Sequence, residues 1–205
     1  MNLSRTDLSM RFGFALSHAL YLHRAQRRKA SEVPYFSHLM AVASIVLDYG
    51  GDEDTAIAAL LHDAVEDQGG MGTHDAIRER CGERVAALVL ALSDSVVAGE
   101  PKAPWEGRKA AYLARLRASA ADVKLIAAAD KLHNLRCTVA DVRVSGRKAM
   151  AKFNAPADRI VAYYAACIAA IRDALPMPLA FELDGALDEL TMLLALPASF
   201  TLIPG

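Results

Sequence analysis

Four ionisable side chains stand close together in the stretch AALLHDAVED, which spans residues 58–67. His62, Asp63, Glu66 and Asp67 follow an apolar run, where an ionised carboxylate costs several kcal/mol unless something compensates for its burial. A divalent cation bound by the Asp63 carboxylate and the neutral His62 imidazole would provide that compensation. Glu66 and Asp67, one helical turn further on, would then face water or substrate. A solvated polar face at a helix end is the simpler alternative.

A metal site needs more than two protein ligands, and the sequence offers two further candidates. His38 precedes the apolar segment LMAVAS, although a lone histidine there is more often a core residue than a ligand. Asp130 follows the run LIAAA, where a carboxylate favours a cation as its partner, with a salt bridge to Lys131 as the alternative. Together with His62 and Asp63, they predict a two-histidine, two-aspartate site drawn from three helices.

The elements that must position these side chains are predicted to be helices almost throughout. Ala, Leu, Arg and Glu dominate, and β-branched runs are short, which favours helix over strand. We expect helices from Thr6 into the basic cluster HRAQRRK, over SHLMAVASIVLDY, from a cap at Asp52 through HDAVED, from a cap at Thr73 to Cys81, over RVAALVLALSDSVV, from about Trp105 to Arg117, around DVKLIAAADKLHNLR, from Asn154 or Pro156 to Leu175, and from Leu183 to Leu196.

The fold class is therefore all-α. We expect a single helical bundle over residues 1–178, followed by a C-terminal helical extension over residues 179–205. That extension would pack on the bundle or at an interface between molecules.

Length and charge narrow the classes of function. The chain has 205 residues, a formal net charge of −1 and 54% hydrophobic residues, which suits one domain with a sizeable core. This charge indicates neither nucleic-acid binding nor attachment to an anionic membrane, and no apolar run is long enough to span a bilayer. The first residues, MNLSRTDLSMRFGF, are unlike a secretory signal, and the three cysteines are scattered. We expect a cytoplasmic protein with a small-molecule partner; a homo-oligomer is compatible with the sequence.

Three blocks of the sequence resemble the HD-domain phosphohydrolases, and within them the small, hydrolase-only RelA/SpoT-type enzymes that act on (p)ppGpp. The blocks are HRAQRRKASEVPYFSHLMAVA, DEDTAIAALLHDAVED and ADKLHNLR, and the likeness covers roughly residues 6–175. The resemblance implies that His38, His62, Asp63 and Asp130 bind one divalent metal ion, usually manganese. It also implies a reaction, the hydrolysis of the 3′-pyrophosphate of a guanosine alarmone with release of pyrophosphate.

The same resemblance extends to residues around the reaction. It implies that Glu66 and Asp67 serve the attacking water, whose pKa a bound metal ion lowers. Arg28 and Lys29 would bind phosphate or stack on the base. The further candidates for substrate contacts are Tyr35, Asn134, Arg159 and Tyr163. Each of these residues also has a plainer interpretation as a packing or surface residue.

The sequence departs from the family pattern where the identity of the substrate is decided. Gln68 replaces a common threonine after Glu-Asp. The segment between Ser93 and Trp105, where the family often has a basic loop that meets phosphate, offers only Lys102. An adenosine alarmone, the 2′-phosphate of NADPH or a nucleoside monophosphate therefore stay open as substrates, as does a regulatory module that binds nucleotide without turnover. We expect no synthetase domain, because 205 residues leave no room for one.

Overall fold

The computed structural model describes residues 6–94 and 104–196, and within them every regular element is a helix, which confirms the all-α prediction. No helix of this part of the chain is both long and apolar enough to cross a membrane. The helices are α1 (Met10–His23), α2 (Phe36–Asp48), α3 (Glu53–Leu61), α4 (Ala64–Gln68), α5 (Met71–Cys81), α6 (Glu83–Leu92), α7 (Trp105–Ala118), α8 (Ala121–Ser145), α9 (Ala157–Ile171) and α10 (Met177–Leu193), with short 3₁₀ helices η1 (Gly146–Lys152) and η2 (Arg172–Ala174).

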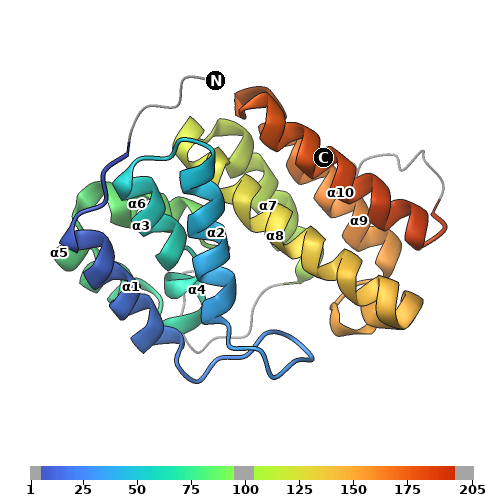
Figure 1. The fold of residues 1–205 in the computed structure, drawn as a ribbon, viewed down its shortest axis with the longest axis horizontal. Coiled ribbons are helices and arrows are strands. Elements are labelled where there is room, and N and C mark those ends of the chain that lie inside the picture. Colours follow the sequence, from blue (N-terminus) through green and yellow to red (C-terminus); the bar gives the residue numbers. More distant parts are fainter. Residues whose placement is uncertain (1–5, 95–103, 197–205) are drawn as a thin grey trace.

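The long helix α8 runs through the middle of the molecule, with α1–α6 on one side and α9 and α10 on the other (Figure 1). It contacts α2, α3 and α6 on the first side and α9 and α10 on the second. Leu39 of α2, Leu61 of α3 and Leu132 of α8 are fully buried in the shared core. Burying one such side chain stabilises the fold by about 1.5–3 kcal/mol. Because α8 touches both sides, it fixes the position of any side chain it carries between them.

Helix α3 is the most completely buried element of this core. Every residue from Thr55 to Leu61 is buried, so the helix has no solvated face beyond its first turn. Its start is fixed by Asp52, whose carboxylate accepts a hydrogen bond from the Thr55 amide at 2.9 Å, as the sequence predicted. His62 follows directly at the other end of the helix, and a helix with apolar contacts on all sides holds that end firmly.

Several helix limits differ from the prediction. Helix α1 begins at Met10 rather than Thr6, because the Ser9 hydroxyl caps it by accepting the Arg11 amide at 3.2 Å. Helix α5 begins at Met71, because the Thr73 hydroxyl donates to the Gln68 carbonyl at 2.8 Å instead of capping the helix.

Two further limits concern the ends of elements near the site and the C-terminus. Helix α6 stops at Leu92, before Ser93, and the residues 95–97 that were expected to continue it lie outside the described part of the chain. Helix α10 begins at Met177, six residues before the predicted start at Leu183, and it accommodates Pro178 in its first turn. The boundary expected after residue 178 therefore falls inside this helix.

Candidate metal centre

Three side chains from three helices meet at one point beside α8. His38 comes from α2, His62 follows α3 and Asp130 lies in α8, and one ligand atom of each lies within 4.8 Å of the others. The Asp130 Oδ1 atom is 3.2 Å from His38 Nε2 and 3.9 Å from His62 Nε2. His38 is fully buried and His62 nearly so. Two imidazole nitrogens and a carboxylate oxygen are a donor set that several divalent metal ions accept.

Asp63 joins this cluster at the junction of α3 and α4, where the regular helix is interrupted. The prediction of one continuous helix through HDAVED is wrong: α3 ends at Leu61 and α4 begins at Ala64. His62 Nδ1 lies 2.8 Å from the Ala59 carbonyl, the group that the Asp63 amide would use in a continuous helix. Asp63 adopts φ −98° and ψ 0°, a sparsely populated region in which many active-site residues sit. As a result, Asp63 Oδ2 lies 2.9 Å from His62 Nε2.

The hydrogen bonds around the two histidines suit metal ligands. When the His62 ring is neutral, its Nδ1–H donates to the Ala59 carbonyl, which leaves Nε2 as a free acceptor aimed at the cluster. His38 Nδ1 lies 2.8 Å from His133 Nδ1, so its Nε2 also faces inward. Both Nε2 atoms are buried, and neither makes a hydrogen bond of normal geometry within the described residues. Buried nitrogens that face carboxylates without such a bond fit a bound cation.

The electrostatics of the cluster favour a positive charge at its centre. Burial lowers the pKa of His62, but the Asp63 and Asp130 carboxylates outweigh it and raise the pKa to about 9. Burial raises the pKa of Asp130, but Lys131 and the imidazoles outweigh it and hold that pKa well below the usual range. A divalent cation can take the place of the proton that the carboxylates draw to His62.

Asp130 also resolves a choice that the sequence left open. Its Oδ1 atom faces His38 and His62, while its Oδ2 atom accepts a hydrogen bond from the Lys131 ammonium. The cation site and the salt bridge are therefore compatible. The Lys131 side chain is 11% exposed, and its Nζ atom lies 5.5 Å from the centre of the Tyr112 ring, so its charge is largely shielded from solvent.

Tyr35 lies next to the same cluster, on the short segment before α2. Its hydroxyl donates a hydrogen bond to Asp63 Oδ2, and its ring lies 5.4 Å from the His38 ring. Tyr35 thereby orients Asp63, a candidate ligand.

Replacing Tyr35 by phenylalanine should weaken the binding of a divalent metal ion by about tenfold while the protein stays folded. Partners that orient metal ligands typically contribute about 10–100-fold to metal affinity or activity. Calorimetric titration with manganese measures this, with Tyr21→Phe as the control, because Tyr21 is 63% exposed on α1. An unchanged affinity in Tyr35→Phe would assign Tyr35 a packing role alone.

A cavity of about 630 Å³ opens over the cluster. Most of the residues predicted from the sequence line it, from five different parts of the chain: Arg28, Lys29, Tyr35, His62, Asp63, Glu66, Asp67, Asp130, Asn134 and Tyr163. His38 is fully buried and does not belong to this lining. Arg159 is not part of the lining; its side chain is 53% exposed and lies 3.7 Å from Glu106 of α7.

The basic pair Arg28 and Lys29 lies on the loop between α1 and α2, not at the end of the first helix as predicted. An isolated antiparallel bridge between Arg27 and Pro34 closes this loop. From the loop, Arg28 Nη2 donates a hydrogen bond to Asn134 Oδ1 at 2.8 Å. A guanidinium therefore reaches across the cavity to α8, one turn beyond Asp130.

Glu66 and Asp67 project from α4, and each is oriented by a neighbour. Glu66 Oε2 accepts a hydrogen bond from the Asp94 amide at 3.1 Å, and Asp67 Oδ2 accepts one from Gln26 Nε2 at 2.9 Å. Gln26 is itself held by Gln68, whose Nε2 donates to Gln26 Oε1 at 2.7 Å. Gln68, which stands where the family commonly has a threonine, thus supports the orientation of Asp67 through Gln26.

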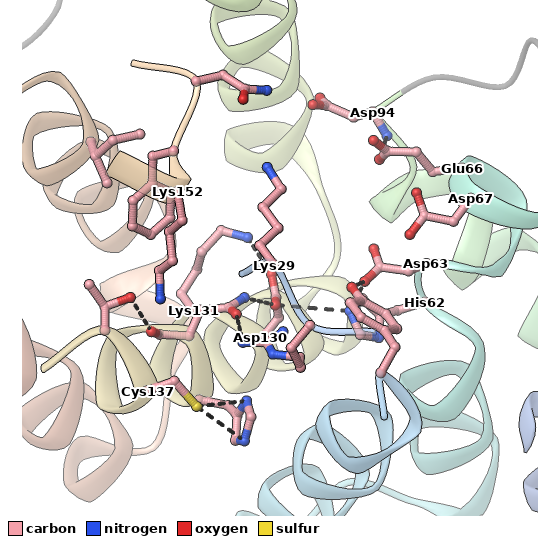
Figure 2. A pocket seen from close by; sticks show the side chains of 18 of the residues that line it. Lys29, His62, Asp63, Glu66, Asp67, Asp94, Asp130, Lys131, Cys137 and Lys152 are labelled. Carbon is pink, nitrogen blue, oxygen red and sulfur yellow. Dashed lines mark hydrogen bonds and ion pairs between the residues drawn. The ribbon is translucent and has the colours of Figure 1, made fainter. Parts of the chain in front are cut away.

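Carboxylates and lysines both line the cavity. Figure 2 shows Asp63, Glu66, Asp67 and Asp94 along one side, which we call the acidic wall. Lysine side chains come from the other parts of the lining: Lys29, Lys131 and Lys152. Lys131 pairs with Asp130 and Lys152 with Asp141, so the cavity offers both negative charge for a cation and positive charge for an anion.

The structure adds cations that the sequence did not single out. Arg108 Nη1 and Lys109 Nζ, both on α7, lie 2.7 and 2.6 Å from Asp94 Oδ2, and all three residues line the cavity. Between Ser93 and Trp105, where the family often has a basic loop that meets phosphate, this sequence offers Lys102. Lys102 lies outside the described residues. Among the described residues, Arg108 and Lys109 in the first turns of α7 bring positive charge to the cavity, and their adjacency in the sequence was the available signal.

Comparisons with known proteins agree with this geometry. The model of the HD domain matches residues 15–154. A probable GTP pyrophosphokinase of Mycobacterium leprae is 39% identical over 116 residues, which are 56% of this chain but only 14% of that protein. The guanosine-3′,5′-bis(diphosphate) 3′-pyrophosphohydrolase MESH1 of Drosophila melanogaster is 34% identical over 131 residues, or 62% of this chain and 69% of that one.

Among solved structures, one is described as a metazoan ortholog of SpoT that hydrolyzes ppGpp. It shares 27% sequence identity and a TM-score of 0.72 with this chain, covering 90% of this chain and 98% of the other. The chain thus spans a small fraction of the long bacterial relative and about two thirds or more of these small proteins.

Proposed function

The chain belongs to the HD-domain family, and we therefore propose that it is a metal-dependent phosphohydrolase acting on guanosine alarmones. In this reaction it removes the 3′-pyrophosphate of (p)ppGpp and releases pyrophosphate. The observation that carries the proposal is the meeting of His38, His62 and Asp130 at a cavity whose lining holds both the acidic wall and several lysines. The activity stated for the similar small proteins supports the choice of substrate.

We propose that His38, His62, Asp63 and Asp130 hold one divalent ion and that the ion is manganese. Such an ion supplies Lewis-acid stabilisation of charge at phosphorus and lowers the pKa of water. The buried Nε2 atoms of the two histidines support this ligand set.

The acidic side chains of α4 provide the base chemistry in this proposal. Glu66, which accepts the Asp94 amide hydrogen bond and lines the cavity beside Asp63, accepts a proton from the attacking water as the general base. Asp67, held by Gln26, orients that water. Both carboxylates lie on the lining of the same cavity as Asp63.

The cations of the lining bind the substrate. Arg28 and Lys29 from the loop bind phosphate or stack on the base, and Lys131 contributes positive charge beside Asp130. Asn134 is positioned to exchange its hydrogen bond from Arg28 for one with the nucleotide. The rings of Tyr35 and Tyr163 form aromatic parts of the cavity lining. We assign no substrate contact to Arg159, because it faces Glu106 outside the lining.

The proposal is tested by identifying the product that the manganese-loaded protein releases from a panel of nucleotides. We expect pyrophosphate from ppGpp and pppGpp, and no release after chelation of the metal. Orthophosphate from NADPH or from a nucleoside monophosphate would replace the alarmone with another substrate. Pyrophosphate from the adenosine alarmone alone would change the base. Tight binding of every nucleotide without turnover would favour a sensing role.

A further inference from the structure

The cavity extends well beyond the metal cluster, along one face of α8. Asp130, Asn134, Thr138 and Asp141 line it in succession. Positions 130 and 141 are roughly 16 Å apart along the helix axis at about 1.5 Å per residue. The far end of the cavity is therefore separate from the metal cluster and distant from the groups that would perform hydrolysis.

A turn after α8 brings a second segment back to this far end. Gly146 ends the helix with φ +61° and ψ −157°, a conformation that is essentially restricted to glycine. The 3₁₀ helix η1 follows and ends at Lys152, and Lys152, Phe153 and Asn154 then line the cavity. The distal wall, which we define as Asp141 and residues 152–154, thus comes from both sides of this turn.

Lys152 is the charged group of the distal wall that faces inward. Its side chain is only 15% exposed, and its Nζ atom lies 2.5 Å from Asp141 Oδ2 and 5.3 Å from the centre of the Phe153 ring. Asp141 is 54% exposed, so water can solvate its carboxylate if the pair opens. Figure 2 shows Lys152 across the cavity from the acidic wall.

We infer that Lys152 binds the 5′-phosphate groups of the substrate, in exchange for its ion pair with Asp141. The inference rests on the proposed function, which places the 3′-pyrophosphate at the metal centre. A nucleoside phosphorylated at both the 3′ and 5′ positions then directs its remaining negative charge away from the acidic wall. Lysine binds phosphate well as a point charge, and the partly buried ammonium strengthens the interaction relative to water.

The exchange of Asp141 for a phosphate at Lys152 would distinguish substrates by the group at their 5′ position. Nucleotides with 5′-phosphates gain an ionic contact at the distal wall, whereas a nucleotide with a free 5′-hydroxyl leaves the Lys152–Asp141 pair intact. Lys152 is thus a specificity-determining residue for the 5′ end of the substrate.

The test compares two substrates, ppGpp and guanosine 3′-diphosphate, in Lys152→Ala, Lys152→Arg and the wild type. The control is Lys148→Ala, which removes the same charge from an exposed position of η1 outside the lining. We expect Lys152→Ala to raise the KM for ppGpp about tenfold with kcat unchanged, and to leave the KM for guanosine 3′-diphosphate unchanged. Lys152→Arg should restore most of the loss, and Lys148→Ala should have no effect. Equal changes for both substrates, or no change for ppGpp, would overturn the inference.

Calorimetric dissociation constants for the same two nucleotides separate this inference from the proposed function. If the wild type binds both nucleotides but releases no pyrophosphate, the proposed function fails. The Lys152 contact is then judged by whether Lys152→Ala weakens ppGpp binding selectively. If the wild type binds neither nucleotide, both proposals fail.

Discussion

Asparagine in place of Asp130 should abolish tight manganese binding and lower kcat/KM for alarmone hydrolysis by about 10³-fold. The Asp130 Oδ1 atom lies 3.2 Å from His38 Nε2 and 3.9 Å from His62 Nε2, so it supplies negative charge at the centre of the cluster. An amide of the same shape removes that charge. Metal catalysis stabilises the transition state by several kcal/mol, and each 1.36 kcal/mol corresponds to about tenfold in rate.

Metal content after dialysis and calorimetric titration with manganese measure this effect directly. Asp130→Asn also leaves the nearly buried Lys131 ammonium without its carboxylate, and breaking such a pair can cost about 3–5 kcal/mol of stability. Asp63→Asn is therefore a useful second variant, because it spares the Lys131 pair. Asp188→Asn, an exposed site on α10, is the control. Wild-type manganese affinity in folded Asp130→Asn and Asp63→Asn would contradict the proposed ligand set.

Glutamine in place of Glu66 should lower kcat by about 10²- to 10⁴-fold, the usual contribution of general acid–base catalysis. The amide keeps an oxygen that can accept the Asp94 amide hydrogen bond, so the side chain should stay in place. It loses the ability to accept a proton from water. Manganese affinity and the KM for ppGpp should stay close to wild type, because Glu66 is not among the proposed metal ligands.

Steady-state kinetics, together with a manganese titration, separate these quantities. Asp67→Asn should have a smaller effect on kcat if Asp67 orients water without taking its proton. Glu79→Gln, the same chemical change at an exposed position of α5, should leave every parameter unchanged. If Asp67→Asn proves severe and Glu66→Gln mild, the two roles must be exchanged. If Glu66→Gln loses its metal instead, Glu66 is a ligand.

The all-α fold was predictable because helix-forming residues and capping signals agree along most of the chain. The cluster of His38, His62 and Asp130 was also predictable from the sequence, since each of these polar residues follows or precedes an apolar run. The break between α3 and α4 was not predictable from periodicity. It depends on the contact of the His62 ring with the Ala59 carbonyl, a local competition that helical spacing does not reveal.

The cations of the cavity were harder to predict for a different reason. Lys131, Arg108 and Lys109 look like ordinary charged positions on helices, and their importance follows from partners distant in sequence. Asp94 brings α7 to the cavity by holding Arg108 and Lys109. Lys131 is enclosed because α8 lies between the two sides of the molecule. Such placements follow from tertiary packing and from no property of the residues taken alone.

The burial of α3 from Thr55 to Leu61 also has a consequence for metal exchange. His62, a proposed metal ligand at the end of so protected a helix, should keep its position whether or not an ion is present. Loss and re-uptake of the ion then require little reorganisation of the polypeptide. Which divalent ion the protein carries is consequently governed by cellular supply as much as by affinity.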